Sequence, residues 1–215
     1  MLLELKKISV PPGQRILLSD ISWQELEDIL QDLGDNRNSK IAYNQGLLEI
    51  MVPLPEHERN KEQISDLLKA LLEELDIEFC TLGSTTFKNR LMLQGMEPDN
   101  CFYIQNEARI RNKDKLDLSI DTPPDLAIEV DVTSRTNPQI YRNLAVPELW
   151  RFERDNLQIN VLIDGEYVST EFSPLFPNLP VKKLIPEYLH KCRIEGRNKS
   201  IKQFRSLIQQ MINKD

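Results

Sequence analysis

The chain has 215 residues, of which 40% are hydrophobic and 28% charged, as in globular proteins that bury a sizeable core. No apolar run approaches the roughly 20 residues that span a bilayer, and the N-terminus lacks the features of a signal peptide. We therefore expect a cytoplasmic protein with no membrane partner. The net charge of −7 counts against tight unaided binding to nucleic acid, although an acidic site can meet phosphate through a divalent cation.

Apolar periodicity along the chain predicts a mixture of helices and strands, in an order typical of an α+β protein. Ser22 is a suitable N-cap for the first helix, and Gly34 ends it. The run Asn44-Gln45-Gly46 tolerates positive φ and favours a hairpin turn. In chain order the expected elements are a helix at 22–33, strands at 40–43 and 47–52, a helix at about 56–75, strands at 77–82 and 84–88, a turn and then a strand within 94–104, a strand at 125–132, a short helix around 138–144, strands at 148–153, 158–163 and 167–171, and helices at 181–191 and 200–212.

The organisation of the chain favours one domain. We find no internal repeat, low-complexity linker or clear domain boundary. Residues 1–215 are therefore expected to form a single domain, with a core at about 20–190 and a helical extension at 195–215. The polar segment 105–122 is expected to be a surface loop. It holds the densest basic patch of the first half of the chain, made of Arg109, Arg111, Lys113 and Lys115.

Two acidic residues carry the chemical interest of the sequence. Asp99 follows a proline at the expected start of a strand, and Glu129 lies inside the apolar strand that begins after two prolines. Because strand residues rise about 3.3 Å each, Asp125 lies about 13 Å from Glu129, too far to share an ion. Asp131 lies only about 6.6 Å from Glu129, and a neighbouring strand brings Asp99 within about 5 Å of an opposed residue. The physically sensible metal pair is Asp99 with Glu129, assisted by Asp131.

The surroundings of Glu129 require an explanation. Apolar residues flank it on both sides, and a buried carboxylate is costly unless it is paired, protonated or bound to metal. One interpretation is a metal site. The alternative is a buried salt bridge with Arg135, Arg142 or Arg151, and spacing alone leaves both open.

Longer motifs surround these acids in a consistent order. Pro-Pro-Asp-Leu-Ala-Ile-Glu-Val at 123–130 is followed by Val-Pro-Glu-Leu-Trp-Arg-Phe at 146–152. Upstream lie Tyr-Asn-Gln-Gly-Leu-Leu-Glu-Ile-Met at 43–51, Pro-Glu-His-Glu at 55–58 and Gly-Met-Glu-Pro-Asp at 95–99. Together, over roughly 20–190, they resemble the Uma-type family of putative restriction endonucleases, a bacterial branch of the PD-(D/E)XK nuclease superfamily. The combination is specific, although each piece alone is not.

The resemblance implies a restriction-endonuclease-like fold, in which helices flank a central mixed β-sheet with a divalent-metal site at its core. Asp99 would match the family's first strand acid and Glu129 the acid of the (D/E)-x-K element. His57 or Glu58 would match the polar position on the first core helix. The implied cofactor is Mg²⁺ or Mn²⁺, and the implied substrate is DNA, whose phosphodiester bonds such enzymes hydrolyse. The family analogy also suggests a homodimer, because duplex cutting needs two active sites.

The sequence departs from the family pattern at the lysine of the (D/E)-x-K element. The residue two after Glu129 is Asp131, and the stretch that follows contains no lysine either. Arg135 or Arg142 could supply the positive charge, but arginine clamps phosphate and is a poor general base. Lys88, on an earlier strand, is a weaker substitute. The sequence therefore predicts a metal-dependent endonuclease, with a catalytically inactive nuclease-fold protein that binds nucleic acid or a protein partner as the alternative.

Overall fold

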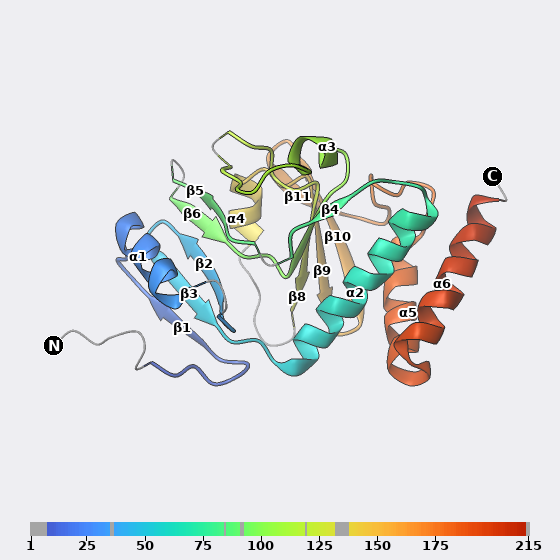
Figure 1. Cartoon of the computed structure of the whole chain (residues 1–215), viewed down its shortest axis with the longest axis horizontal. Helices are drawn as coiled ribbons and strands as arrows, with labels where there is room; N and C mark the ends of the chain where they lie inside the picture. The colour runs from blue at the N-terminus through green and yellow to red at the C-terminus, as the bar shows by residue number, and fades with distance from the viewer. Residues whose placement is uncertain are drawn as a thin grey trace.

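The structure is a computed structural model that describes residues 8–34, 37–83, 85–90, 93–118, 120–131 and 138–213. Two β-sheets and a group of helices make up this part of the chain (Figure 1). The α+β class expected from the sequence is confirmed, and the larger sheet is mixed, as predicted. The second sheet is antiparallel throughout, and the sequence patterns do not foresee that it is separate.

The smaller, N-terminal sheet has the strand order β1-β3-β2-β6-β5. Helix α1, Trp23–Leu33, begins after Ser22, whose hydroxyl accepts from the backbone N–H of Glu25 while the Glu25 side chain accepts from that of Ser22. Leu26 and Ile29 of α1 pack with buried apolar residues of β2 and β3, so this helix covers one face of the sheet. The strands are β1 Arg15–Leu18, β2 Lys40–Asn44, β3 Leu47–Met51, β5 Phe87–Asn89 and β6 Gln94–Met96.

The larger, central sheet has the strand order β11-β10-β9-β8-β7-β4. Its strands are β4 Cys80–Thr81, β7 Asn100–Tyr103, β8 Leu126–Val130, β9 Glu148–Glu153, β10 Asn156–Ile163 and β11 Glu166–Thr170. Among the strand pairs that the structure describes, β8 and β9 alone run parallel, and the described part of their connection contains the short helix α4, Pro138–Asn143. A parallel pair needs such a crossover, because a tight hairpin can join antiparallel strands only.

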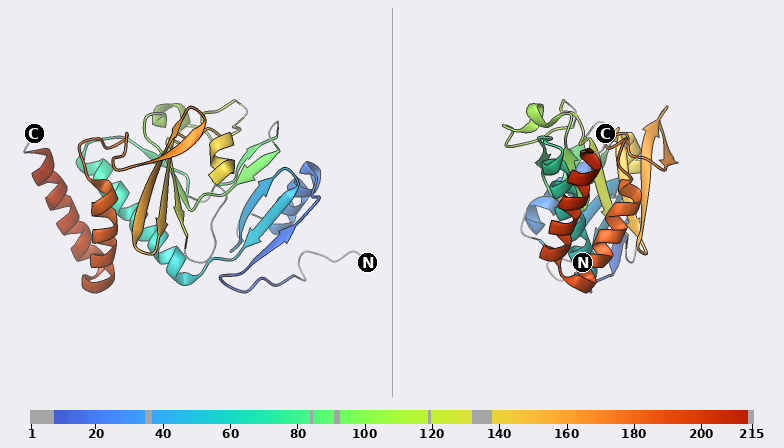
Figure 2. Two further views of the ribbon diagram at one scale, coloured as in Figure 1. Left: turned by 180° about the vertical axis from the view of Figure 1, so that it is seen from behind. Right: turned by 90° about the vertical axis from the view of Figure 1, so that its right-hand side faces the viewer.

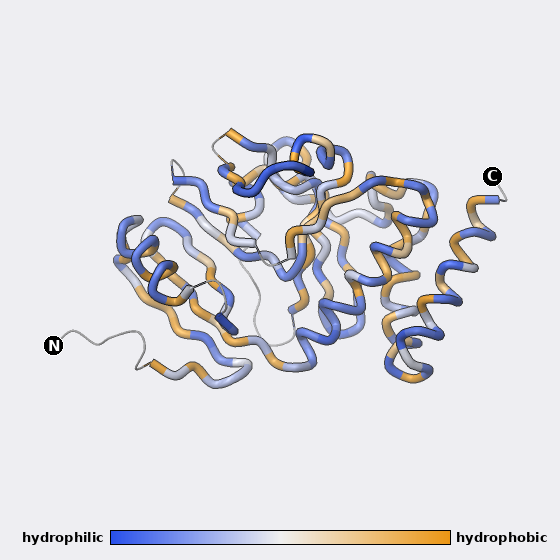
Figure 3. The backbone as a smooth tube through the Cα atoms, viewed as in Figure 1, coloured by the Kyte–Doolittle hydropathy of each residue, from blue (hydrophilic) through white to orange (hydrophobic). Residues whose placement is uncertain are grey.

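Two helices pack on one face of the central sheet, and a third packs against these two (Figures 1 and 2). They are α2 Pro55–Glu74, α5 Val181–Glu195 and α6 Arg197–Ile212, and apolar and polar stretches alternate along them (Figure 3). Their buried residues share a core with Leu126, Ile128 and Val130 of β8. None of the helices in the described ranges is both long and apolar enough to cross a membrane.

The opposite face of β8 packs against different elements. Ala127 shares a core with Ile140 and Tyr141 of α4. Successive strand residues point to opposite faces, so Glu129 lies on the same face as Ala127. The acid that the sequence singles out therefore points toward α4 and away from the layer formed by α2, α5 and α6.

Several boundaries differ from the expected elements. The predicted turn that begins at 94 is the strand β6, because pairing with β2 on one side and β5 on the other overrides the low strand propensity of Gly95. The predicted surface loop 105–122 contains one helical turn, α3, at Glu107–Ile110. The strands expected at 77–82 and 84–88 are reduced to β4 and β5.

Candidate active site

Strand register places Asp99 beside Glu129. Strands β7 and β8 are antiparallel, and Asn100 lies opposite Ile128. Continuing that register by one residue sets Asp99, just before β7, opposite Glu129. The backbone N–H of Val130 donates to Asp99 Oδ2 at 2.7 Å, which fixes one oxygen of this carboxylate against β8. Both acids are almost fully buried, with exposed fractions of 1% for Asp99 and 2% for Glu129.

Lys40, the first residue of β2 in the N-terminal sheet, joins the two acids. Its Nζ atom lies 2.7 Å from Asp99 Oδ1 and 3.2 Å from Glu129 Oε2. The other Glu129 oxygen accepts a hydrogen bond from the Tyr141 hydroxyl of α4. The site thus gathers side chains from both sheets and from α4.

Helix α2 adds His57 from its first turn. His57 is 4% exposed, and its Nε2 atom lies 3.0 Å from the Asp99 carboxylate. Its Nδ1 atom lies 3.1 Å from Glu58 Oε1, and Glu58 also pairs with Lys61 Nζ at 2.5 Å. Asp99 is therefore held from three directions, by β8, β2 and α2.

These contacts shift the pKa values of the site in opposite directions. Burial by itself would raise the pKa of Asp99, but Lys40 and His57 outweigh it and hold that pKa well below its usual range. Burial raises the pKa of Glu129 above its usual value, against the opposing charge of Lys40. Burial would lower the pKa of His57, but hydrogen bonds to Asp99 and Glu58 raise it to about 9. Asp99 is thus the more firmly ionised of the two acids, and His57 is cationic at neutral pH.

Lys40 remains a cation in this environment. Burial by itself would lower its pKa, but the charges of Asp99 and Glu129 raise it above the ordinary lysine value. A lysine that keeps its proton serves as a hydrogen-bond donor and a positive charge and does not act as a base.

Asp131, expected to assist the metal pair, has a different partner. Arg151 of β9 holds its carboxylate, with Nε at 3.0 Å and Nη2 at 2.5 Å. Within the described part of the chain, no group of three or more histidine, cysteine, aspartate or glutamate side chains is arranged to hold a metal ion. The roles of Asp99, Glu129 and Asp131 as ligands stay predictions.

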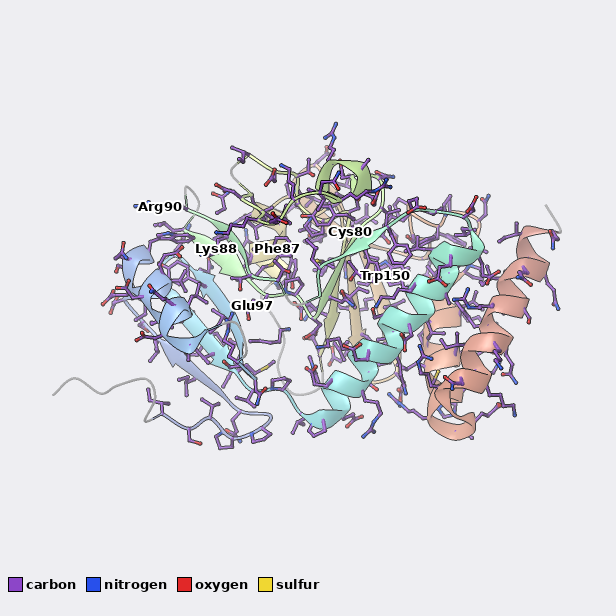
Figure 4. The ribbon with its side chains drawn as sticks, in the orientation of Figure 1. Cys80, Phe87, Lys88, Arg90, Glu97 and Trp150 are labelled. Carbon is purple, nitrogen blue, oxygen red and sulfur yellow. The ribbon has the colours of Figure 1, made fainter. Side chains whose placement is uncertain are left out.

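The cations considered from the sequence lie elsewhere. Arg142 pairs with Glu166, and Arg151 pairs with Asp131. Lys88, labelled on β5 in Figure 4, lies 2.7 Å from Glu27 Oε2 of α1 and does not substitute for the missing lysine. Arg135 falls outside the described residues.

Asp125 makes the motif easy to find, but it stabilises a loop. Its carboxylate accepts from Ile104 N at 2.7 Å, Asn106 N at 3.0 Å and Asn106 Nδ2 at 2.6 Å. These bonds tie the segment after β7 to the start of β8. The inference that Asp125 is too far along the strand to act beside Glu129 agrees with these separate partners.

The chemistry of the pair suits a hard divalent cation. Two carboxylates face each other, and the Lys40 ammonium between them marks a position where positive charge is stabilised. Mg²⁺ is commonly held by one or two carboxylates, with water and substrate phosphate completing its shell. Asp99 and Glu129 therefore fit such an ion, provided that Lys40 gives up one of its contacts.

A cavity of about 450 Å³ opens beside Lys40. Its wall includes three cations, Arg37, Lys40 and Lys61, together with Glu58 and Glu97. Arg37 bonds Glu97, and Lys61 bonds Glu58. Lys40 is therefore reached from this cavity, with charged side chains on either side.

Sequence reasoning missed Lys40 and Tyr141. Lys40 begins a hairpin strand 59 positions before Asp99, and nothing in its local pattern indicates that it meets a central-sheet acid. Tyr141 lies in the segment that resembles the family, on a short helix after β8. This position is the feature of the sequence that could have indicated a role in the site.

The α+β core thus brings two buried acids on neighbouring strands together with a lysine from the other sheet. The family model described as "Putative restriction endonuclease", Uma2, matches residues 23–192, and the chain belongs to this family. A crystal structure described as a putative nuclease belonging to DUF820 from Anabaena variabilis is similar, with 13% identity and a TM-score of 0.48. That match covers 69% of this chain and 90% of the other. Among curated proteins, no sequence matches.

Proposed function

We propose that this protein is an endonuclease that hydrolyses DNA phosphodiester bonds with the help of Mg²⁺ or Mn²⁺ held by Asp99 and Glu129. The observation that carries the proposal is the pairing of these two buried acids across β7 and β8, with Lys40 bonded to both. Membership of a family described as "Putative restriction endonuclease" supports the reaction class and the substrate.

Each side chain of the site has a role in this proposal. Asp99 and Glu129 supply the carboxylate oxygens. His57 bonds Asp99 on one side and Glu58 on the other, so it orients the Asp99 carboxylate. The Tyr141 hydroxyl fixes one oxygen of Glu129 and leaves the other directed toward Lys40. A divalent ion in this position, when bound, polarises a phosphate oxygen and activates water for attack.

The competing function is a nuclease-fold protein that no longer cleaves. One observation favours it: position 131 holds an aspartate that is engaged by Arg151, so the (D/E)-x-K element has no lysine. Such a protein would bind nucleic acid or a protein partner without hydrolysis. The net charge of −7 argues against strong unaided binding to DNA.

Plasmid nicking in the presence of Mn²⁺ separates the two functions. Wild-type protein should convert supercoiled plasmid to the nicked form. Glu129→Gln should reduce the nicking rate by about 10³-fold or more, which is the size of effect seen when a group that stabilises the transition state is removed. Glu148→Gln, which changes another buried glutamate one strand away, is the matched control and should keep the wild-type rate. Wild-type protein that neither binds Mn²⁺ by calorimetry nor cleaves any form of DNA would overturn the proposal.

A further inference from the structure

We propose that Lys40 supplies the positive charge that the (D/E)-x-K element lacks, by donating a hydrogen bond to a non-bridging oxygen of the phosphodiester that is cut. This inference rests on the proposed nuclease function and assigns a role to a residue outside the family-like motifs. Lys40 lies in the other sheet, ahead of both acids in the chain.

The geometry of Lys40 leaves it one hydrogen-bond donor to offer. A protonated lysine has three N–H donors. Among the described residues its ammonium has two partners, Asp99 and Glu129. The side chain is 13% exposed and forms part of the wall of a cavity.

The cavity that Lys40 lines has a volume of about 450 Å³. Ligand sites have volumes of about 300–1,000 Å³, so a phosphate with its sugar can be accommodated there. Arg37 and Lys61 lie in the same wall, but each is paired with an acid of that wall, Glu97 and Glu58. Lys40 is the cation of this wall that also contacts the Asp99–Glu129 pair.

The fixed backbone and the flexible side chain of Lys40 suit this role. Its backbone belongs to a hairpin, opposite Met51 of β3, which holds the start of the side chain in place. The flexible four-carbon stem allows the ammonium to turn from one carboxylate toward a phosphate without moving the strand. Position 131 cannot do the same, because its aspartate is an anion that only accepts hydrogen bonds, and its carboxylate pairs with Arg151.

The chemical step that Lys40 assists is hydrolysis. A bond forms between phosphorus and the oxygen of a water molecule, and the ester bond between phosphorus and the leaving oxygen breaks. One proton of the water leaves for solvent, and the leaving oxygen takes up one proton. Lys40 keeps its own proton throughout and stabilises the negative charge that gathers on the phosphate oxygens.

The test compares Lys40→Met with Lys88→Met at saturating Mn²⁺. Lys88 is a lysine of the same sheet that pairs with Glu27 on the surface, so its replacement controls for loss of a positive charge. Lys40→Met should slow plasmid nicking by about 10²-fold or more, the size expected for losing one donor to the transition state. Its affinity for Mn²⁺, measured by calorimetry, should be at least that of wild type, because no ammonium competes for the carboxylates. Lys88→Met should match wild type in both measurements.

Two results would overturn the role of Lys40. A purely structural counter-ion would be replaced by bound metal, so Lys40→Met would cleave at the wild-type rate once Mn²⁺ is saturating. Loss of Mn²⁺ binding in folded Lys40→Met would also contradict the inference. Both results leave the nuclease proposal standing, whereas wild-type protein without cleavage or Mn²⁺ binding removes that proposal itself.

Lys40→Gln provides the test if Lys40→Met fails to melt cooperatively. Glutamine keeps a hydrogen-bond donor beside the buried acids but carries no positive charge. We expect this variant to fold, to bind Mn²⁺ and to cleave at least about 10-fold more slowly than wild type. A wild-type rate in folded Lys40→Gln would show that the positive charge at this position does not matter and would overturn the inference.

Discussion

The two ends of β8 each carry a buried acid, and their surroundings differ. At the start of the strand, Asp125 accepts three hydrogen bonds from one loop, all from neutral N–H groups. Near the other end, Glu129 meets a lysine from another sheet and a tyrosine from a helix. Burial and motif membership are the same for both residues. A candidate site differs from a loop anchor in two ways: several elements converge on one carboxylate, and a partner of that carboxylate, Lys40, lines a cavity.

The largest effect is expected from Asp99→Asn. The change removes the more firmly charged member of the acid pair while keeping its size, so DNA cleavage should fall by about 10³-fold or more. Plasmid nicking with Mn²⁺ measures this loss. Asp125→Asn, at the loop end of β8, should retain cleavage wherever the protein is folded. If folded Asp99→Asn and folded Asp125→Asn lost activity equally, the proposed difference between the two ends of β8 would be wrong.

Asp125→Ala is expected to reduce stability and to leave metal binding unchanged. It leaves two backbone N–H groups, those of Ile104 and Asn106, without their charged acceptor. We expect the free energy of unfolding to drop by about 2–4 kcal/mol, measured by urea denaturation. Calorimetry on the folded variant should show Mn²⁺ affinity like that of wild type. A drop below about 1 kcal/mol would show that Asp125 does not anchor the loop.

Glu148 on β9 provides a third buried acid for comparison. Burial raises the pKa of Glu148, although a hydrogen bond from Trp150 opposes that shift. Because the folded protein favours the protonated form, stability is greatest below the ordinary carboxyl pKa and falls as pH rises through the raised folded value. Glutamine carries no charge, so Glu148→Gln should not lose stability as the pH rises. Its melting temperature should therefore exceed that of wild type at neutral pH, and the two melting temperatures should differ less at pH 4. A wild-type advantage at neutral pH would contradict this account.

The smallest effects are expected in the basic segment 105–122. The exposed Arg111 pairs with the buried carboxylate of Glu107, and the exposed Lys113 pairs with the largely buried carboxylate of Asp121. Solvent screens an ion pair whose cation is exposed, so each pair should contribute about 1 kcal/mol at most, and Arg111→Ala and Lys113→Ala should barely change the melting temperature. Because both cations are already paired, DNA affinity by fluorescence anisotropy should change less than about threefold. A larger loss of affinity would indicate that DNA binds to this segment and would contradict the proposal that it binds at the cavity beside Lys40.

Much of the fold could be predicted from the sequence. Ser22 and Gly34 mark the ends of α1, and Asn44-Gln45-Gly46 forms the expected hairpin turn between β2 and β3. These features depend on local chemistry and therefore leave a signature in neighbouring residues. Strand β6 has no such signature, because its conformation comes from pairing with two partner strands.

The residues of the candidate site also fall into those with a local sequence signature and those without one. Asp99 and Glu129 could be singled out because a strand acid among apolar neighbours is unusual, and register then explains their proximity. Lys40 could not be singled out, since its contact with them depends on how two separate sheets pack. The metal-ligand role of Asp131 was inferred from spacing along one strand, which carries no information about Arg151 on the next.

Anomalous diffraction from crystals soaked in Mn²⁺ tests the central claim most directly. We predict a peak between the carboxylates of Asp99 and Glu129, within about 2.0–2.3 Å of an oxygen from each, and its disappearance in Glu129→Gln crystals. Lys40 should then have lost its contact with at least one of these acids. A Mn²⁺ peak elsewhere in protein that cleaves DNA, with Lys40 still bonded to both carboxylates, would contradict the account.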